Sequence, residues 1–80
     1  MSTLQRLQEI FQDVFNDDEL IIAEHMSAED IPEWDSLMHV TLMFEVESSF
    51  QLRFASHEIA QLNTVGDLMA LVDRYQASKG

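Results

Sequence analysis

Residues 31–50 read IPEWDSLMHVTLMFEVESSF, and this stretch decides the fold. Asp35 is a favourable helix N-cap, so Ser36 becomes the first residue of a helix that we expect to run to about residue 49. The only proline of the chain lies before this helix, and alternating stretches rich in β-branched residues are missing. The sequence therefore predicts an all-α protein.

The helix that begins at Ser36 is rich in apolar residues. A step of 100° per residue places most of them on one broad arc, which we expect to face the core. This arc contains Leu37, Val40, Met43, Phe44, Val46 and Phe50, with Leu42 at its edge. The opposite arc contains Met38, Thr41, Glu45, Ser48 and Ser49. The helix is predicted to pack centrally, with Met38 pointing toward solvent.

The first 35 residues are predicted to form an amphipathic helix and a long acidic loop. Ser2 with Gln5 fits a capping box, and apolar residues then recur at helical spacing through about residue 15. Residues 16–35 hold eight carboxylates, but they also contain Leu20, Ile21, Ile22, Met26 and Ile31. Loops of this length are uncommon unless they serve a function or are held in place. We expect the apolar residues to pin the loop over the core, with one short turn over residues 27–30.

Two more helices are expected after residue 50. Ser56 can cap a short helix over residues 56–62, and Thr64 with Asp67 fits a capping box that opens a last helix through about residue 75. Its inward side chains are predicted to be Val65, Leu68, Leu71 and Val72. The result is a four-helix bundle with a long first loop and a short third helix, forming one domain over residues 1–80 in which residues 76–80 fray.

The composition limits the classes of partner. Fifteen Asp and Glu residues against four Lys and Arg residues give a formal net charge of -11. Nucleic acids and anionic membranes bind clustered cations, so we expect neither as a partner and favour basic protein surfaces, although acidity also serves solubility. The absence of cysteine excludes disulfides and cysteine-based zinc sites. With no membrane span or secretory signal evident, we expect a cytoplasmic monomer without a metal site.

Ser36 is the residue on which chemistry is expected. Free N–H groups and the positive end of the macrodipole at a helix start favour an anionic group on its oxygen. The flanking sequence is not Gly-x-Ser-x-Gly, and nothing ties His25, His39 or His57 to this serine in a catalytic triad. Asp35 is engaged in capping and badly placed to act as a base. We interpret Ser36 as an acceptor of modification and expect no catalytic residue. The tripeptide Asp-Ser-Leu at residues 35–37 also fits an ordinary capped helix start without any modification.

From residue 31 to residue 75 the chain resembles the acyl carrier and peptidyl carrier protein family. Asp-Ser-Leu at residues 35–37 opens a helix, Phe-Glu-Val-Glu-Ser-Ser-Phe at residues 44–50 closes it, and Asn-Thr-Val-Gly-Asp-Leu at residues 63–68 opens the last helix. The resemblance implies that Ser36 receives 4'-phosphopantetheine from coenzyme A, through a separate magnesium-dependent phosphopantetheinyl transferase. The thiol of this arm would carry an acyl group as a thioester.

The resemblance also implies partners and a docking face. The partners would be the transferase, a ligase that loads acyl or aminoacyl groups, and downstream synthases or transferases with basic docking patches. The docking face carried over to this chain is Asp35, Leu37, Met38, Thr41, Glu45 and Glu47. The implied role is in fatty acid or polyketide biosynthesis, while Trp-Asp-Ser-Leu is similar to freestanding carriers of specialised pathways, including aminoacyl or peptidyl carriers. From another class, an unmodified acidic adaptor is the alternative.

Overall fold

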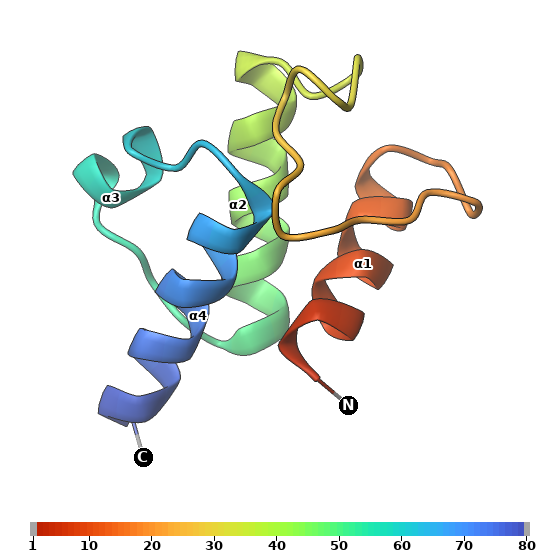
Figure 1. Cartoon of the computed structure of the whole chain (residues 1–80). Coiled ribbons are helices and arrows are strands. Elements are labelled where there is room, and N and C mark those ends of the chain that lie inside the picture. Colours follow the sequence, from red (N-terminus) through yellow and green to blue (C-terminus); the bar gives the residue numbers. More distant parts are fainter. Residues whose placement is uncertain (1, 80) are drawn as a thin grey trace.

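The protein is a bundle of four helices joined by one long and two short connections. The computed structural model describes residues 2–79, with the side chains of residues 2–78. The helices are α1 (Thr3–Val14), α2 (Ser36–Phe50), α3 (Ser56–Ala60) and α4 (Val65–Lys79). Figure 1 shows that α1 runs in the opposite direction to α2 and α4, and α1 packs against both of them. The predicted all-α, four-helix fold is confirmed.

The core lies between the three long helices. Their buried apolar side chains are Leu7, Ile10 and Phe11 of α1, Leu42, Met43, Val46 and Phe50 of α2, and Val65, Leu68, Leu71 and Val72 of α4. All four residues predicted to face inward on the last helix are buried, as expected. Because one fully buried side chain of this size contributes about 1.5–3 kcal/mol, this shared core is the main source of stability.

The long loop between α1 and α2 is pinned to the bundle, as predicted. Its buried or half-buried anchors are Leu20, Ile22, Met26 and Ile31. Ile21 was predicted to be a fifth anchor, but it is 68% exposed. Two glutamines of α1 also hold the loop: Gln8 Oε1 accepts a hydrogen bond from Ile22 N at 3.2 Å, and Gln12 Nε2 donates one to Leu20 O at 2.9 Å. These polar anchors are not apparent in the apolar pattern of the sequence.

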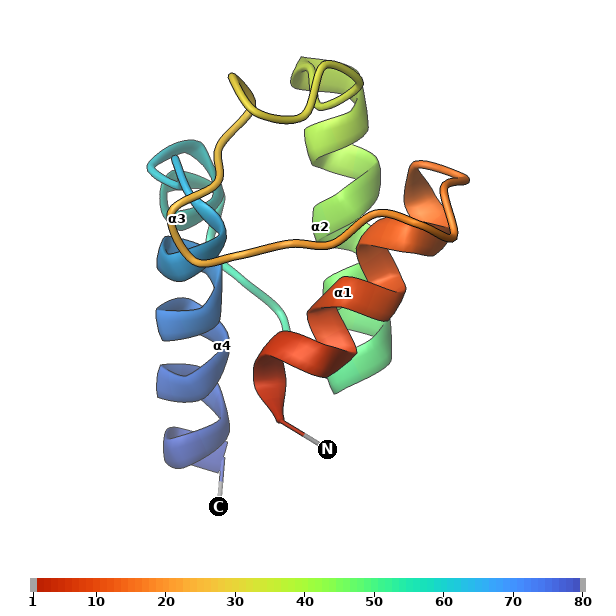
Figure 2. The same ribbon diagram turned by 45° about the vertical axis from the view of Figure 1, so that its right-hand side comes forward.

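The same loop is tied to the start of α4, which it passes on its way to α2 (Figure 2). Met26 O accepts a hydrogen bond from Val65 N at 2.9 Å, and Glu24 O accepts one from Gly66 N at 2.8 Å. A Cβ atom on Gly66 would lie 3.1 Å from Glu24 O, which is tighter than ordinary contact. Glycine therefore permits the close approach of the two backbones. The predicted turn is also present, with Asp30 N donating to Ser27 O.

The face of α2 that points inward differs from the prediction. Leu37, Val40 and Phe44 were expected in the core, but they are 74%, 64% and 71% exposed. Met38, expected to point toward solvent, is half-buried. The apolar residues of α2 cover two adjacent faces of the helix, and the bundle has room for only one of them. Helical periodicity alone cannot decide which face is buried.

The boundaries of the last two helices also differ from the prediction. The N-cap of α3 is Ala55, and Ser56 is the first helical residue, so the predicted cap at Ser56 was wrong. Glu58 closes this turn instead, because its Oε1 accepts a hydrogen bond from Ala55 N at 3.1 Å. The helix α4 extends beyond the expected end near residue 75 to Lys79. Fraying of residues 76–79 stays a prediction, and Gly80 lies outside the described residues.

Candidate functional site

Ser36 lies at the start of α2, as predicted, and its side chain is exposed. Asp35 is the N-cap of this helix, with its Oδ1 accepting a hydrogen bond from Met38 N at 2.9 Å. The first turn of α2 contains no acidic residue. The first N–H groups of a helix lack partners within the helix, and the macrodipole adds partial positive charge there. The backbone at the start of α2 therefore favours an anionic substituent on the hydroxyl oxygen of Ser36.

Trp34, the residue before Asp35, holds the chain in place where it enters α2. Its side chain is only 6% exposed, and its ring packs edge-on against Phe11 with centroids 5.4 Å apart. The other neighbour of the indole is His39, whose ring is stacked on it at 5.9 Å between centroids. The Nε1 of Trp34 donates a hydrogen bond to His39 Nδ1 at 3.0 Å. Trp34 is thus anchored in the core, and it holds in place Asp35 and Ser36, which we call the serine turn.

The second ring nitrogen of His39 is also engaged. His39 Nε2 lies 3.1 Å from the backbone oxygen of Ile59 in α3. Both nitrogens of His39 are therefore occupied, and the carboxylate of Asp35 caps Met38. A general base must be within hydrogen-bond distance of the proton it removes and must have a free lone pair. His39 therefore has no free lone pair for Ser36, so the site fits an acceptor of modification better than a nucleophile activated by this histidine.

An open cleft of about 690 Å³ lies beside Ser36. It is bordered by the start of α2, by α3 with the connection to α4, and by residues 27–29 of the long loop. The lining residues are Ser27, Ala28, Glu29, Trp34, Asp35, Ser36, His39, Ile59, Ala60, Leu62, Asn63 and Thr64. The cleft therefore borders the hydroxyl that was predicted to accept a flexible arm.

The residues carried over as the docking face do not share one environment. Asp35, Leu37, Thr41 and Glu45 are exposed, and Met38 is half-buried. Glu47 is half-buried as well, and its Oε2 accepts a hydrogen bond from Phe54 N at 2.7 Å, in the connection that follows α2. The carboxylate of Glu47 thus has a structural role.

Leu37 was predicted to belong to this face, but the sequence analysis did not assign Val40 and Phe44 to it. Val40 and Phe44 are exposed on the same side of α2 as Leu37, at the spacing of successive helical turns. We call Leu37, Val40 and Phe44 the exposed apolar stripe. The excess of apolar residues on α2 was the available signal, because one helix face cannot bury them all.

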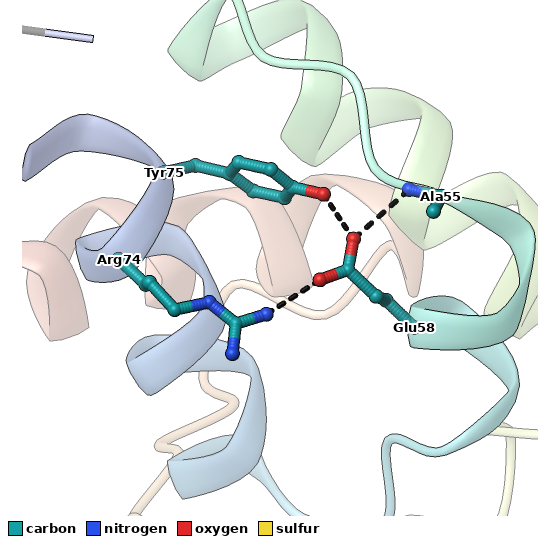
Figure 3. A network of polar contacts seen from close by, with 4 residues as sticks. All are labelled: Ala55, Glu58, Arg74 and Tyr75. Atoms are coloured by element: carbon teal, nitrogen blue, oxygen red, sulfur yellow. Dashed lines mark hydrogen bonds and ion pairs between the residues drawn. The ribbon is translucent and has the colours of Figure 1, made fainter. Parts of the chain in front are cut away.

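The helix α3 is joined to α4 by a polar network around Glu58 (Figure 3). The Tyr75 hydroxyl donates a hydrogen bond to Glu58 Oε1, and Arg74 forms an ion pair with Glu58 Oε2. The hydrogen bond from Tyr75, then that from Ala55 N, and the charge of Arg74 lower the pKa of the Glu58 carboxyl below its ordinary value of 4.5. The same carboxylate raises the pKa of Tyr75 above 10.0. The network favours the charged form of Glu58.

Two further findings concern the described part of the chain. Within residues 2–79, no helix has the length and apolar character needed to cross a bilayer. The same residues contain no group of three or more His, Cys, Asp or Glu side chains arranged to hold a metal ion.

The fold and this site are those of the acyl carrier type of protein, a small helical bundle with an exposed serine at the start of its second helix. The family described as "Phosphopantetheine attachment site" matches residues 5–72, and the chain belongs to this family. It is a carrier rather than a catalyst, and its prosthetic group is a covalently attached phosphopantetheine. A carrier of this kind interacts with a phosphopantetheinyl transferase and with pathway enzymes. The family predicted from the sequence is confirmed.

A solved structure supports the same assignment. The solution NMR structure of the holo acyl carrier protein from Geobacter metallireducens is similar to this chain, with a TM-score of 0.90 and 43% sequence identity. The similarity covers 99% of this chain and 91% of that protein. No curated protein sequence matches this chain.

Proposed function

We propose that this chain carries acyl groups on a 4'-phosphopantetheine arm attached through the Ser36 hydroxyl. The observation that carries the proposal is the place of Ser36: it is exposed, and it is the first residue of a 15-residue helix. Its two neighbours with acid or base groups, Asp35 and His39, are both engaged in other hydrogen bonds. The serine is accessible to a visiting transferase, and His39, with both ring nitrogens bonded, is not free to activate it.

The residues around Ser36 fit a phosphodiester. The start of α2 offers backbone N–H groups and the positive end of the helix dipole, which stabilise a nearby anion by about 0.3–1 kcal/mol at an exposed position. Asp35 sets the direction in which the chain enters α2 by capping Met38. Trp34 holds that entry in the core. When attached, the arm supplies the thiol on which an acyl group is carried as a thioester.

Partner enzymes are proposed to dock on the start and exposed side of α2. Asp35 and Glu45 supply negative charge, which attracts basic patches of a partner. The exposed apolar stripe supplies the apolar contacts that usually contribute most of the binding energy at the centre of an interface. Glu47 contributes less to docking, since its carboxylate is already bound to Phe54 N.

Mass spectrometry after loading tests the attachment site. The purified chain is incubated with coenzyme A, magnesium and a broad-range phosphopantetheinyl transferase, and its intact mass is measured. We expect an increase equal to one phosphopantetheinyl group in the unsubstituted chain and no increase in Ser36→Ala. Ser56→Ala is the matched control, because Ser56 is also an exposed serine at the first position of a helix. This control should be modified like the unsubstituted chain.

Two outcomes would contradict the proposal. If Ser36→Ala still gains the mass of one arm, the attachment residue lies elsewhere. If the unsubstituted chain stays unmodified with several transferases, the alternative of an unmodified acidic adaptor gains support. The kind of cargo, acyl or aminoacyl, is tested separately by offering the loaded chain to ligases for each class of acid and measuring the mass again.

A further inference from the structure

The helix α3 is held in the fold by few apolar contacts. It has five residues, and none of them is buried. Ile59 and the following Leu62 are partly buried against the core. Two polar contacts hold α3 from opposite directions: Glu58 is bound by Arg74 and Tyr75 of α4, and Ile59 O is bound by His39 of α2. The position of α3 therefore depends on a small number of hydrogen bonds.

The hydrogen-bond partners define the protonation state of His39. The indole N–H of Trp34 can only donate a hydrogen bond, so His39 Nδ1 must be unprotonated to accept it. The neutral ring then carries its proton on Nε2, which points at Ile59 O and donates to it. A protonated imidazolium has two donors and no acceptor, so it cannot keep the bond from Trp34.

We propose that His39, in its neutral Nε2–H form, is a positioning residue that connects Trp34 to α3. When the ring is protonated or replaced, α3 separates from α2. This inference goes beyond the carrier role, because it assigns His39 the control of the cleft beside Ser36. His39 of α2 and Ile59 of α3 both line that cleft. The bond between them joins α2 to α3 at the cleft.

Two carboxylates line the cleft together with His39. Glu29 and Asp35 line the same cleft as His39, one from the long loop and the other from the serine turn. On α3, Glu58 is directed toward α4 (Figure 3), and His57 is exposed and does not line the cleft. The bond from Trp34 requires a neutral ring, whichever of these groups is charged.

Two substitutions separate the hydrogen bonds from the size of the side chain. In His39→Gln, the amide oxygen can accept from Trp34 and the amide nitrogen can donate to Ile59 O, and this group carries no charge at any pH. His39→Leu fills similar space and makes neither bond. Amide hydrogen exchange measured by NMR on the unmodified chain reports on α3 through residues 59, 61 and 62, whose N–H groups donate to backbone oxygens.

We expect His39→Leu to speed the exchange of the α3 amides by about tenfold relative to the buried turns of α1, and His39→Gln to leave it near that of the unsubstituted chain. Acidification should loosen α3 in the unsubstituted chain more than in His39→Gln, after correction for intrinsic exchange. Glu58 is present in both the unsubstituted chain and His39→Gln, so the difference between these two chains does not contain its contribution. Equal exchange in all three chains, or equally fast exchange in both variants, would overturn the proposal.

A measurement without substitution covers the case in which His39→Leu does not fold. The ¹⁵N shifts of the imidazole identify its tautomer directly. We expect the Nε2–H form, together with a Trp34 emission that changes when the bond to His39 is lost; Trp34 is the only tryptophan of the sequence. The Nδ1–H tautomer, or a cation at neutral pH, would contradict the proposal. All of these measurements use the chain without the arm. A negative result is therefore distinct from the finding that Ser36 does not accept the arm.

Discussion

The second and third helices both begin with an exposed serine, but they are held in the fold by different forces. Four buried side chains anchor α2, whereas α3 has no buried residue and depends on the bonds of Glu58 and of Ile59 O. Apolar burial is not directional and tolerates changes of pH and salt, while single hydrogen bonds and ion pairs do not. Ser36 therefore lies on the more firmly anchored of the two helices, and we expect α3, which lines the same cleft, to be displaced more readily.

The largest expected effect concerns the two apolar faces of α2. Leu42→Ala removes a side chain that is fully buried, and it should lower the free energy of unfolding by about 2–5 kcal/mol. Phe44→Ala removes a larger side chain from the same helix, but it should change stability by less than about 0.5 kcal/mol, because Phe44 is exposed. Urea denaturation of both variants makes the comparison. A loss at Phe44 as large as that at Leu42 would show that the exposed apolar stripe is covered in solution.

The next effect concerns α3 and depends on pH. Because the folded pKa of Glu58 is lowered, its contribution to stability is fully present above the ordinary value of 4.5 and is lost as the pH falls through the folded pKa. Glu58→Gln should therefore be less stable than the unsubstituted chain near neutral pH and nearly equal to it in acid. Thermal unfolding as a function of pH checks this expectation. Glu45→Gln is the control, because it makes the same change of charge at an exposed position of α2. A difference that persists unchanged into acid would argue against the charged network.

The smallest expected effect is that of salt. Ten of the 15 carboxylates lie in the first 35 residues, where they repel one another, so added salt should raise the melting temperature by a few degrees. The same salt screens the Arg74–Glu58 ion pair. We therefore expect amide exchange in α3 to become faster relative to α1 while the whole chain melts later. A parallel slowing of exchange in both helices would remove the distinction between them.

Local signals in the sequence predicted most of the fold. The capping residues Asp35, Ser2 with Gln5, and Thr64 with Asp67 identified the starts of the three long helices, because a cap is a contact between residues close in sequence. The cap of α3 was misassigned to Ser56, since a glutamate three residues after Ala55 can perform the same task.

The features that the sequence did not predict depend on contacts between distant residues. Periodicity places Leu37 and Phe44 beside Met43, but only the packing of α1 and α4 decides which of them is buried. The partners of His39 are Trp34 and the backbone oxygen of Ile59, which lies 20 positions away in the sequence. Every residue has the same backbone carbonyl group, so a sequence pattern does not show which carbonyl accepts a given hydrogen bond. The candidate serine and the helices around it were predicted, but the hydrogen bonds that join Trp34, His39 and Ile59 were not.

The central claim is that the hydroxyl of Ser36 holds the arm on which this protein carries its cargo. The most direct measurement is tandem mass spectrometry of the protein purified from its native host, with the modified residue located within its peptide. The account predicts a phosphopantetheinyl group on Ser36, with or without an acyl group on its thiol, and an unmodified Ser56. An arm located on any other residue, or a chain that is unmodified in cells that load their other carriers, would contradict it.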